Sequence, residues 1–92
     1  MSSKSQGGCF VGVDVSKAHL DVCIRPMDEC FTVTNDQEGI QKLITHLHGY
    51  ALRMVVLEAT GGYEREVYTE LSAAGLVTVR INPRQARNFA KS

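Results

Sequence analysis

The segment CFVGVDV at residues 9–15 decides how the rest of this sequence is interpreted. It is short, rich in β-branched residues and largely apolar, which is typical of a central strand covered on both faces. Asp14 interrupts the apolar run. The next segment, HLDVCIR at residues 19–25, alternates apolar and polar residues and predicts a strand with one buried face. Turn residues at 26–28 and the segment CFTVT at residues 30–34 then predict a hairpin.

The rest of the chain alternates between helical and strand patterns. A capping residue at Asn35 or Asp36 precedes the first helical pattern. In the second helical pattern, the spacing assigns Tyr63 to the core. The predicted elements are a helix with apolar positions Ile40, Leu43, Ile44 and Leu47, a strand at residues 54–57, a helix with Tyr63, Val67, Leu71 and Ala74, a strand at residues 77–81, and a helix that begins at Asn82 and Pro83.

These elements predict an α/β fold in the order β-β-β-α-β-α-β-α. Right-handed crossovers place the strand at residues 54–57 beside the strand at residues 9–15 and parallel to it, because the two most apolar strands belong in the middle of a sheet. We therefore expect a mixed five-stranded sheet with helices on its faces.

Size and composition are those of one soluble globular domain. The chain has 92 residues, 43% of them hydrophobic and 22% charged, which is too short for two domains and unlike a disordered or fibrous sequence. Residues 1–8 predict a flexible leader and residues 9–92 the domain. The sequence contains neither an apolar run of membrane-spanning length nor a secretion signal, so we expect a cytoplasmic protein without a membrane partner.

The cysteines predict free thiols. Cys9, Cys23 and Cys30 are odd in number and contain no C-x-x-C pair. This pattern favours buried free thiols over a disulfide framework or a zinc site.

Two acidic residues stand at the ends of the two most apolar strands. Asp14 lies near the end of the first strand, and Glu58 directly follows the run at residues 54–57. Neighbouring parallel strands end at the same edge of a sheet, so the two carboxylates should converge there. A divalent cation held by carboxylate oxygens would explain both. The alternative is that each accepts hydrogen bonds from the backbone or pairs with Lys17.

Basic residues gather at the end of the chain. Residues 76–92 hold Arg80, Arg84, Arg87 and Lys91 and no acid, so this segment carries +4 and the remainder −4. On a helix, the last three form one stripe at spacings of three and seven, which suits nucleic-acid phosphates, with Arg80 as a helper. The alternative is a solvated helix face.

Three strings resemble one protein family, namely VGVDVSKAHLDVCI at residues 11–24, VVLEATGGYE at residues 55–64 and VTVRINPRQARNFAKS at residues 77–92. They are similar to the DEDD transposases of the insertion sequence 110 family, which are related to Piv-type DNA invertases. The resemblance implies an RNase H-like, RuvC-type N-terminal domain in which Asp14 is the first acid and Glu58 the second. Ser16, Lys17 and Thr60 are then candidates for supporting contacts near the site.

The resemblance also implies a cofactor, partners and a longer protein. The cofactor is Mg²⁺ or Mn²⁺, and the partners are DNA, a guide-like RNA and further copies of the chain. The family has two more aspartates and a serine-bearing domain, which this sequence lacks. We therefore expect a domain truncated at its C-terminal side before the second acidic pair. The whole protein would be the DNA-cleaving recombinase, and the 92-residue chain alone would be inactive with weakly bound or no metal.

Other classes of function stay open at this point. The chain could be a noncatalytic assembly module that pairs through exposed strand edges or apolar helix faces. An ATP-binding fragment like those of sugar kinases and actin is disfavoured, because residues 14–17, DVSK, lack the glycine that brings backbone close to phosphate. Gly61 and Gly62 fit a phosphate-binding loop or simply a tight turn.

Overall fold

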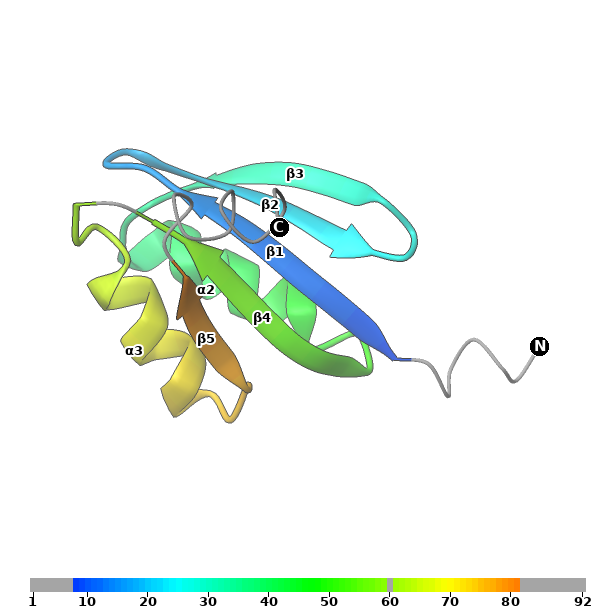
Figure 1. The fold of residues 1–92 in the computed structure, drawn as a ribbon. Helices are drawn as coiled ribbons and strands as arrows, with labels where there is room; N and C mark the ends of the chain where they lie inside the picture. Colours follow the sequence, from blue (N-terminus) through cyan, green and yellow to red (C-terminus); the bar gives the residue numbers. More distant parts are fainter. Residues whose placement is uncertain (1–7, 60, 82–92) are drawn as a thin grey trace, which may run out of the picture.

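Strand β1 (Cys9–Val15) lies in the middle of a mixed five-stranded sheet of order β3-β2-β1-β4-β5 (Figure 1). The structure is a computed structural model that describes residues 8–59 and 61–81. Its other elements are β2 (His19–Arg25), β3 (Glu29–Thr34), α2 (Gln37–Leu47), β4 (Leu52–Glu58), α3 (Arg65–Ala73) and β5 (Thr78–Ile81).

The strand connections are those predicted from the sequence. β1, β2 and β3 pair antiparallel, whereas β4 pairs parallel with β1 and β5 parallel with β4. The predicted order β-β-β-α-β-α-β is confirmed. The third predicted helix, from Asn82 onward, and the leader lie outside the described residues.

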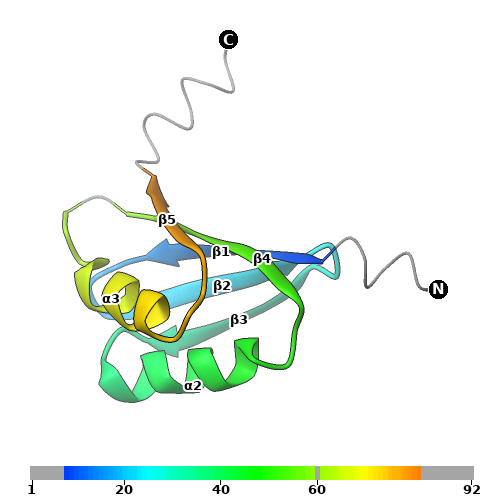
Figure 2. The same ribbon diagram turned by 90° about the horizontal axis from the view of Figure 1, so that it is seen from below.

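Both described helices cover the same face of the sheet (Figure 2). The core forms between this face and the apolar sides of α2 and α3, and includes Val13 of β1, Leu57 of β4 and Leu43 of α2, each at most 1% exposed. Neither described helix is long and apolar enough to cross a membrane.

The opposite face of the sheet is open within residues 8–59 and 61–81. In β1 the exposed Phe10, Gly12 and Asp14 alternate with buried valines. Within the described residues this strand is covered on one face only, and its predicted covering on both faces stays a prediction because the third predicted helix lies outside those residues. Phenylalanine and glycine lengthened the apolar run without lying in the core, because side chains of a strand alternate between its two faces.

Helix α2 begins at a cap that the sequence left ambiguous. The cap is Asp36, whose Oδ1 accepts hydrogen bonds from the backbone N–H of Gly39 at 2.8 Å and from the hydroxyl of Thr34 at 2.9 Å. The hydrogen bond from Gly39, and to a lesser extent the one from Thr34, lowers the pKa of Asp36 below its usual 3.8, because both favour the ionised carboxylate. Gly39 itself is buried against Thr34 at the end of β3.

The turn before α3 differs from the prediction at Tyr63. Its side chain is 48% exposed and precedes the helix, so the assignment of Tyr63 to the core is wrong. The helix begins only at Arg65, because Gly61 and Gly62 have φ of +101° and +84°, left-handed values that no helix continues. This geometry explains the glycine pair as a tight turn.

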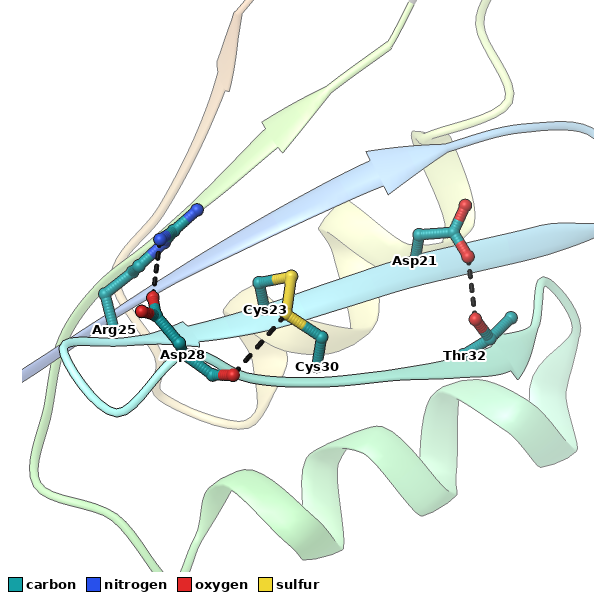
Figure 3. Close-up of a disulfide and its surroundings, with 6 residues drawn as sticks. All are labelled: Asp21, Cys23, Arg25, Asp28, Cys30 and Thr32. Atoms are coloured by element: carbon teal, nitrogen blue, oxygen red, sulfur yellow. Dashed lines mark hydrogen bonds and ion pairs between the residues drawn. A yellow bond between two sulfur atoms is a disulfide. The ribbon is translucent and has the colours of Figure 1, made fainter.

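Cys23 and Cys30 form a disulfide, contrary to the expectation of free thiols (Figure 3). The two residues are direct partners in the antiparallel pairing of β2 with β3, with Cα atoms 4.1 Å apart. Their separation of seven residues carried no such signal, because the pairing depends on the register of the hairpin. Cys9 is free and half-buried.

We predict that Gly39→Ala destabilises the domain although alanine favours helices. The added methyl group would overlap the backbone carbonyl of Thr34, so the start of α2 would have to move away from β3. The free energy of unfolding, measured by urea denaturation, should fall by about 3 kcal/mol. Gly49→Ala is the matched control, because the nearest atom to its methyl group is an ordinary contact at 3.6 Å. Equal effects of the two variants would contradict this account of α2.

The lowered pKa of Asp36 predicts a pH-dependent contribution to stability. The ionised carboxylate is favoured in the folded state, so its contribution is present above the unfolded pKa near 3.8 and is lost as the pH falls through the lower folded value. Asp36→Asn keeps an acceptor oxygen but not the charge. We expect the variant to have a lower urea midpoint than the wild type at pH 6 and the difference to shrink by pH 2.5. A constant difference would show that the charge plays no part.

Candidate functional site

Asp14 and Glu58 are direct partners in the parallel pairing of β1 with β4. Adjacent strands lie about 4.8 Å apart, so the two side chains leave neighbouring positions on the backbone. Both residues are exposed on the open face, near the ends of their strands. The structure thus brings together the two acids that the sequence placed at one edge of the sheet.

Neither carboxylate has a protein partner among the described residues. The side-chain hydrogen bonds and ion pairs of residues 8–59 and 61–81 engage other groups. The alternative partner, Lys17, is exposed in the turn after β1 and forms no ion pair there. The oxygens of Asp14 and Glu58 are therefore available to a ligand as far as the described residues are concerned.

A third carboxylate, Asp21 of β2, stands on the other side of Asp14. The two aspartates are direct antiparallel partners. Asp21 Oδ1 accepts a hydrogen bond of 2.7 Å from the Thr32 hydroxyl on β3 (Figure 3). Sequence reasoning placed Asp21 on the polar side of its strand but did not connect it with the site. Counting residues outward from a two-residue turn at 17–18, which pairs Ser16 with His19, would have paired it with Asp14.

These acids line one hollow of about 310 Å³ on the open face. Within the described residues, no three side chains of His, Cys, Asp or Glu are arranged so that they could hold a metal ion together. In this part of the chain, the hollow therefore offers the carboxylates of Asp14 and Glu58, with Asp21 beside them held by its hydrogen bond from Thr32. Its lining residues are Gly12, Val13, Asp14, Asp21, Cys23, Arg25 and Glu58.

Ser16 shapes the turn that follows Asp14. Its backbone N–H and its hydroxyl each donate to the carbonyl of His19 at 2.9 Å, and its Oγ accepts from the N–H of His19 at 3.2 Å. Ser16 thus closes the turn between β1 and β2. Thr60, the other predicted supporting hydroxyl, lies outside the described residues.

Arg80 is the member of the predicted basic set that the structure describes. It is paired in register with Leu57, a core residue, and so lies on the helix-bearing face of the sheet. Its guanidinium carbon is 4.6 Å from the centre of the Tyr68 ring, and Nη1 is 3.5 Å from Glu64 Oε2. Arg84, Arg87 and Lys91 lie outside the described residues.

Solved structures of other proteins share this fold. The chain matches RuvC of T. thermophilus, solved in complex with a Holliday junction substrate, with a TM-score of 0.66 and 13% identity over 87% of this chain and 68% of that one. It also matches Pelota of Archaeoglobus fulgidus, with a TM-score of 0.58 and 13% identity over 88% of this chain and 29% of that one. At such identity the likeness shows the fold alone, which is RuvC-type and RNase H-like, as predicted.

Sequence comparison identifies the family. No curated protein matches the chain. A family model described as a transposase, for the DEDD transposases of the insertion sequence 110 type, matches residues 11–92. That match contains the strand pair with its two acids and most of the core. The chain therefore belongs to the DEDD transposase family of insertion sequence 110.

Proposed function

We propose that this domain uses Asp14 and Glu58 to hold a divalent cation at a DNA phosphate for strand cleavage and transfer. The observation that carries the proposal is their direct pairing across β1 and β4, on the open face, with no partner for either carboxylate among the described residues. Like charges at directly paired positions destabilise a sheet, and a bound cation would relieve that repulsion.

The residues fit a hard cation. Carboxylate oxygens are the ligands that Mg²⁺ and Mn²⁺ prefer, and Asp14 and Glu58 supply them from adjacent backbone positions. The cation would stabilise the negative charge that develops on the phosphoryl oxygens. Two metals would require further carboxylates, since each must be fixed about 4 Å from the other. The described pair therefore accounts for one part of a metal centre.

The row of like charges supports a ligand-binding role over a structural one. Asp21, Asp14 and Glu58 occupy directly neighbouring positions on three adjacent strands. Like charges in such positions destabilise a sheet. A cation held by Asp14 and Glu58 would relieve part of this repulsion, whereas a purely structural surface would gain nothing from the row.

The proposed nucleic-acid contacts belong to the stripe of Arg84, Arg87 and Lys91. Arg80 is already engaged by Glu64 and Tyr68 on the helix-bearing face, which favours a packing role for it. The partner is DNA, in line with the family, and a guide-like RNA would offer the same phosphate chemistry.

Assembly with further copies of the chain is a second candidate function. It is favoured by Phe10 and Val79, large apolar side chains that are 46% and 39% exposed, on β1 and on the edge strand β5. An assembly surface of this kind would need neither Asp14 nor Glu58, so the metal-binding variants below distinguish the two candidates.

We predict that Asp14→Asn and Glu58→Gln each weaken Mn²⁺ binding by at least about tenfold. Each substitution removes a charged ligand but keeps the size of the side chain. The free Mn²⁺ remaining in a titration of the 92-residue chain, followed by electron paramagnetic resonance, gives the affinity directly.

Two variants control for charge alone. Asp21→Asn removes a neighbouring charge whose carboxylate is held by Thr32, and should cost less than about threefold. Glu66→Gln removes an exposed charge from α3 and should change nothing measurable. If Asp14→Asn behaves like Glu66→Gln, the proposed metal site is wrong.

We predict weak duplex binding whose dependence on salt reports the basic stripe. Three phosphate contacts give a slope of log affinity against log salt of about −3, and removing one cation should reduce its magnitude by about one. Replacing Arg84, Arg87 and Lys91 by glutamine should abolish binding to a labelled duplex. Arg65→Gln, which removes an exposed cation from α3, should leave the slope unchanged. Unaltered binding by the triple variant would mean that the stripe is only a solvated surface.

A further inference from the structure

Asn35 links three connecting segments at the edge of the sheet where β1 and β4 end. It is half-buried between β3 and α2. Its side-chain Nδ2 donates to the backbone carbonyl of Ser16 at 2.9 Å and to that of Tyr63 at 3.1 Å. Its own backbone N–H donates to the carbonyl of Ala18 at 2.9 Å.

The two side-chain partners belong to the loops that follow the paired acids. Ser16 comes two residues after Asp14, in the turn between β1 and β2. Tyr63 comes five residues after Glu58, in the connection from β4 to α3. The side-chain amide of Asn35 thus joins the loop that follows Asp14 to the loop that follows Glu58.

The register of β1 with β4 sets the backbone positions of the two acids, and the loops that follow influence how far apart the carboxylates lie. Glu58 is the last residue of β4, so the pairing with β1 does not continue beyond it. The connection that follows includes Gly61 and Gly62, which have left-handed backbone conformations and no side chains to pack. Beyond the ends of the strands, the side chain of Asn35 bonds to both loops and so joins them.

We propose that Asn35 is a positioning residue that sets the spacing of the Asp14 and Glu58 carboxylates. The inference rests on the proposed metal-binding function. Asparagine suits the place because an amide nitrogen carries two protons, and both acceptors are carbonyl oxygens. Aspartate has the same shape but offers only acceptors when ionised, so it would repel both carbonyls and separate the loops.

The test compares Mn²⁺ affinity in Asn35→Asp and in the wild-type chain at pH 7.5. We expect binding to weaken by about tenfold, the range found for residues that orient metal ligands. Charge alone predicts the opposite, because a new carboxylate near the site would attract the cation more strongly. The Mn²⁺ affinity of Asn35→Ser, which retains one hydrogen-bond donor, should lie between those of the wild type and Asn35→Asp. Affinity equal to or higher than wild type in Asn35→Asp would overturn the inference.

Tyr50→Phe is the control for a merely structural loss. It removes the hydrogen bond from the Tyr50 hydroxyl to Glu29 at the other end of β3 and should leave the Mn²⁺ affinity unchanged. If it weakens binding as much as Asn35→Asp does, general destabilisation explains both results and the positioning role is wrong.

Amide hydrogen exchange tests the link without any metal. The Ser16 N–H donates to the His19 carbonyl in the turn after β1. The Tyr68 N–H donates to the Glu64 carbonyl in the first turn of α3, where the loop after β4 ends. Asn35→Asp should raise both exchange rates by about fivefold or more, whereas Tyr50→Phe should raise neither. Faster exchange in only one region would refute the link. Mn²⁺ binding that is insensitive to Asp14→Asn would instead refute the proposed function, and the exchange rates would still decide whether Asn35 joins the loops.

Discussion

The parallel pairing of β1 with β4 is the constraint on which the rest of this molecule depends. It sets Val13 beside Leu57 on the buried face and, one position further along, Asp14 beside Glu58 on the open face. Side chains of a strand alternate with a period of two, so one register serves both the core and the site. Shifting either strand by one residue would bury its carboxylate and expose its core residue. The hydrophobic effect thus secures the pairing of the acids.

The two faces of the sheet differ in what they carry: one packs into the core, and the other presents the exposed acids. α2 and α3 bury the apolar face, and their caps and turns serve that packing (Figure 2). The open face carries the acidic row across β2, β1 and β4, where like charges oppose stability. The disulfide of Cys23 with Cys30 and the bond from Thr32 to Asp21 tie β3 to the strand that bears the third acid (Figure 3). A sheet with a well-packed opposite face can tolerate such a row.

Geometry at the edge of the sheet depends on the connecting segments. The ladder between β1 and β4 ends at the acids, and beyond it the backbone turns through Ser16 on one side and Gly61 on the other. Asn35 arrives from a third segment and bonds to both turns. The RuvC structure shares the fold at 13% identity, so the pattern of buried residues, and not the particular side chains, specifies this framework.

The sequence by itself determined the five strands, the two described helices, their order and the position of the two acids, because period and apolar runs can be counted along one chain. Only the tertiary structure decided which residues of different segments contact one another and which side chains stay exposed. It paired Cys23 with Cys30 and Asp21 with Asp14, turned Arg80 toward Tyr68, and left one side of β1 open among the described residues. Those outcomes depend on the register between strands and on which face the helices cover. Neither is set by any single segment, since both follow from how the whole sheet buries its apolar side.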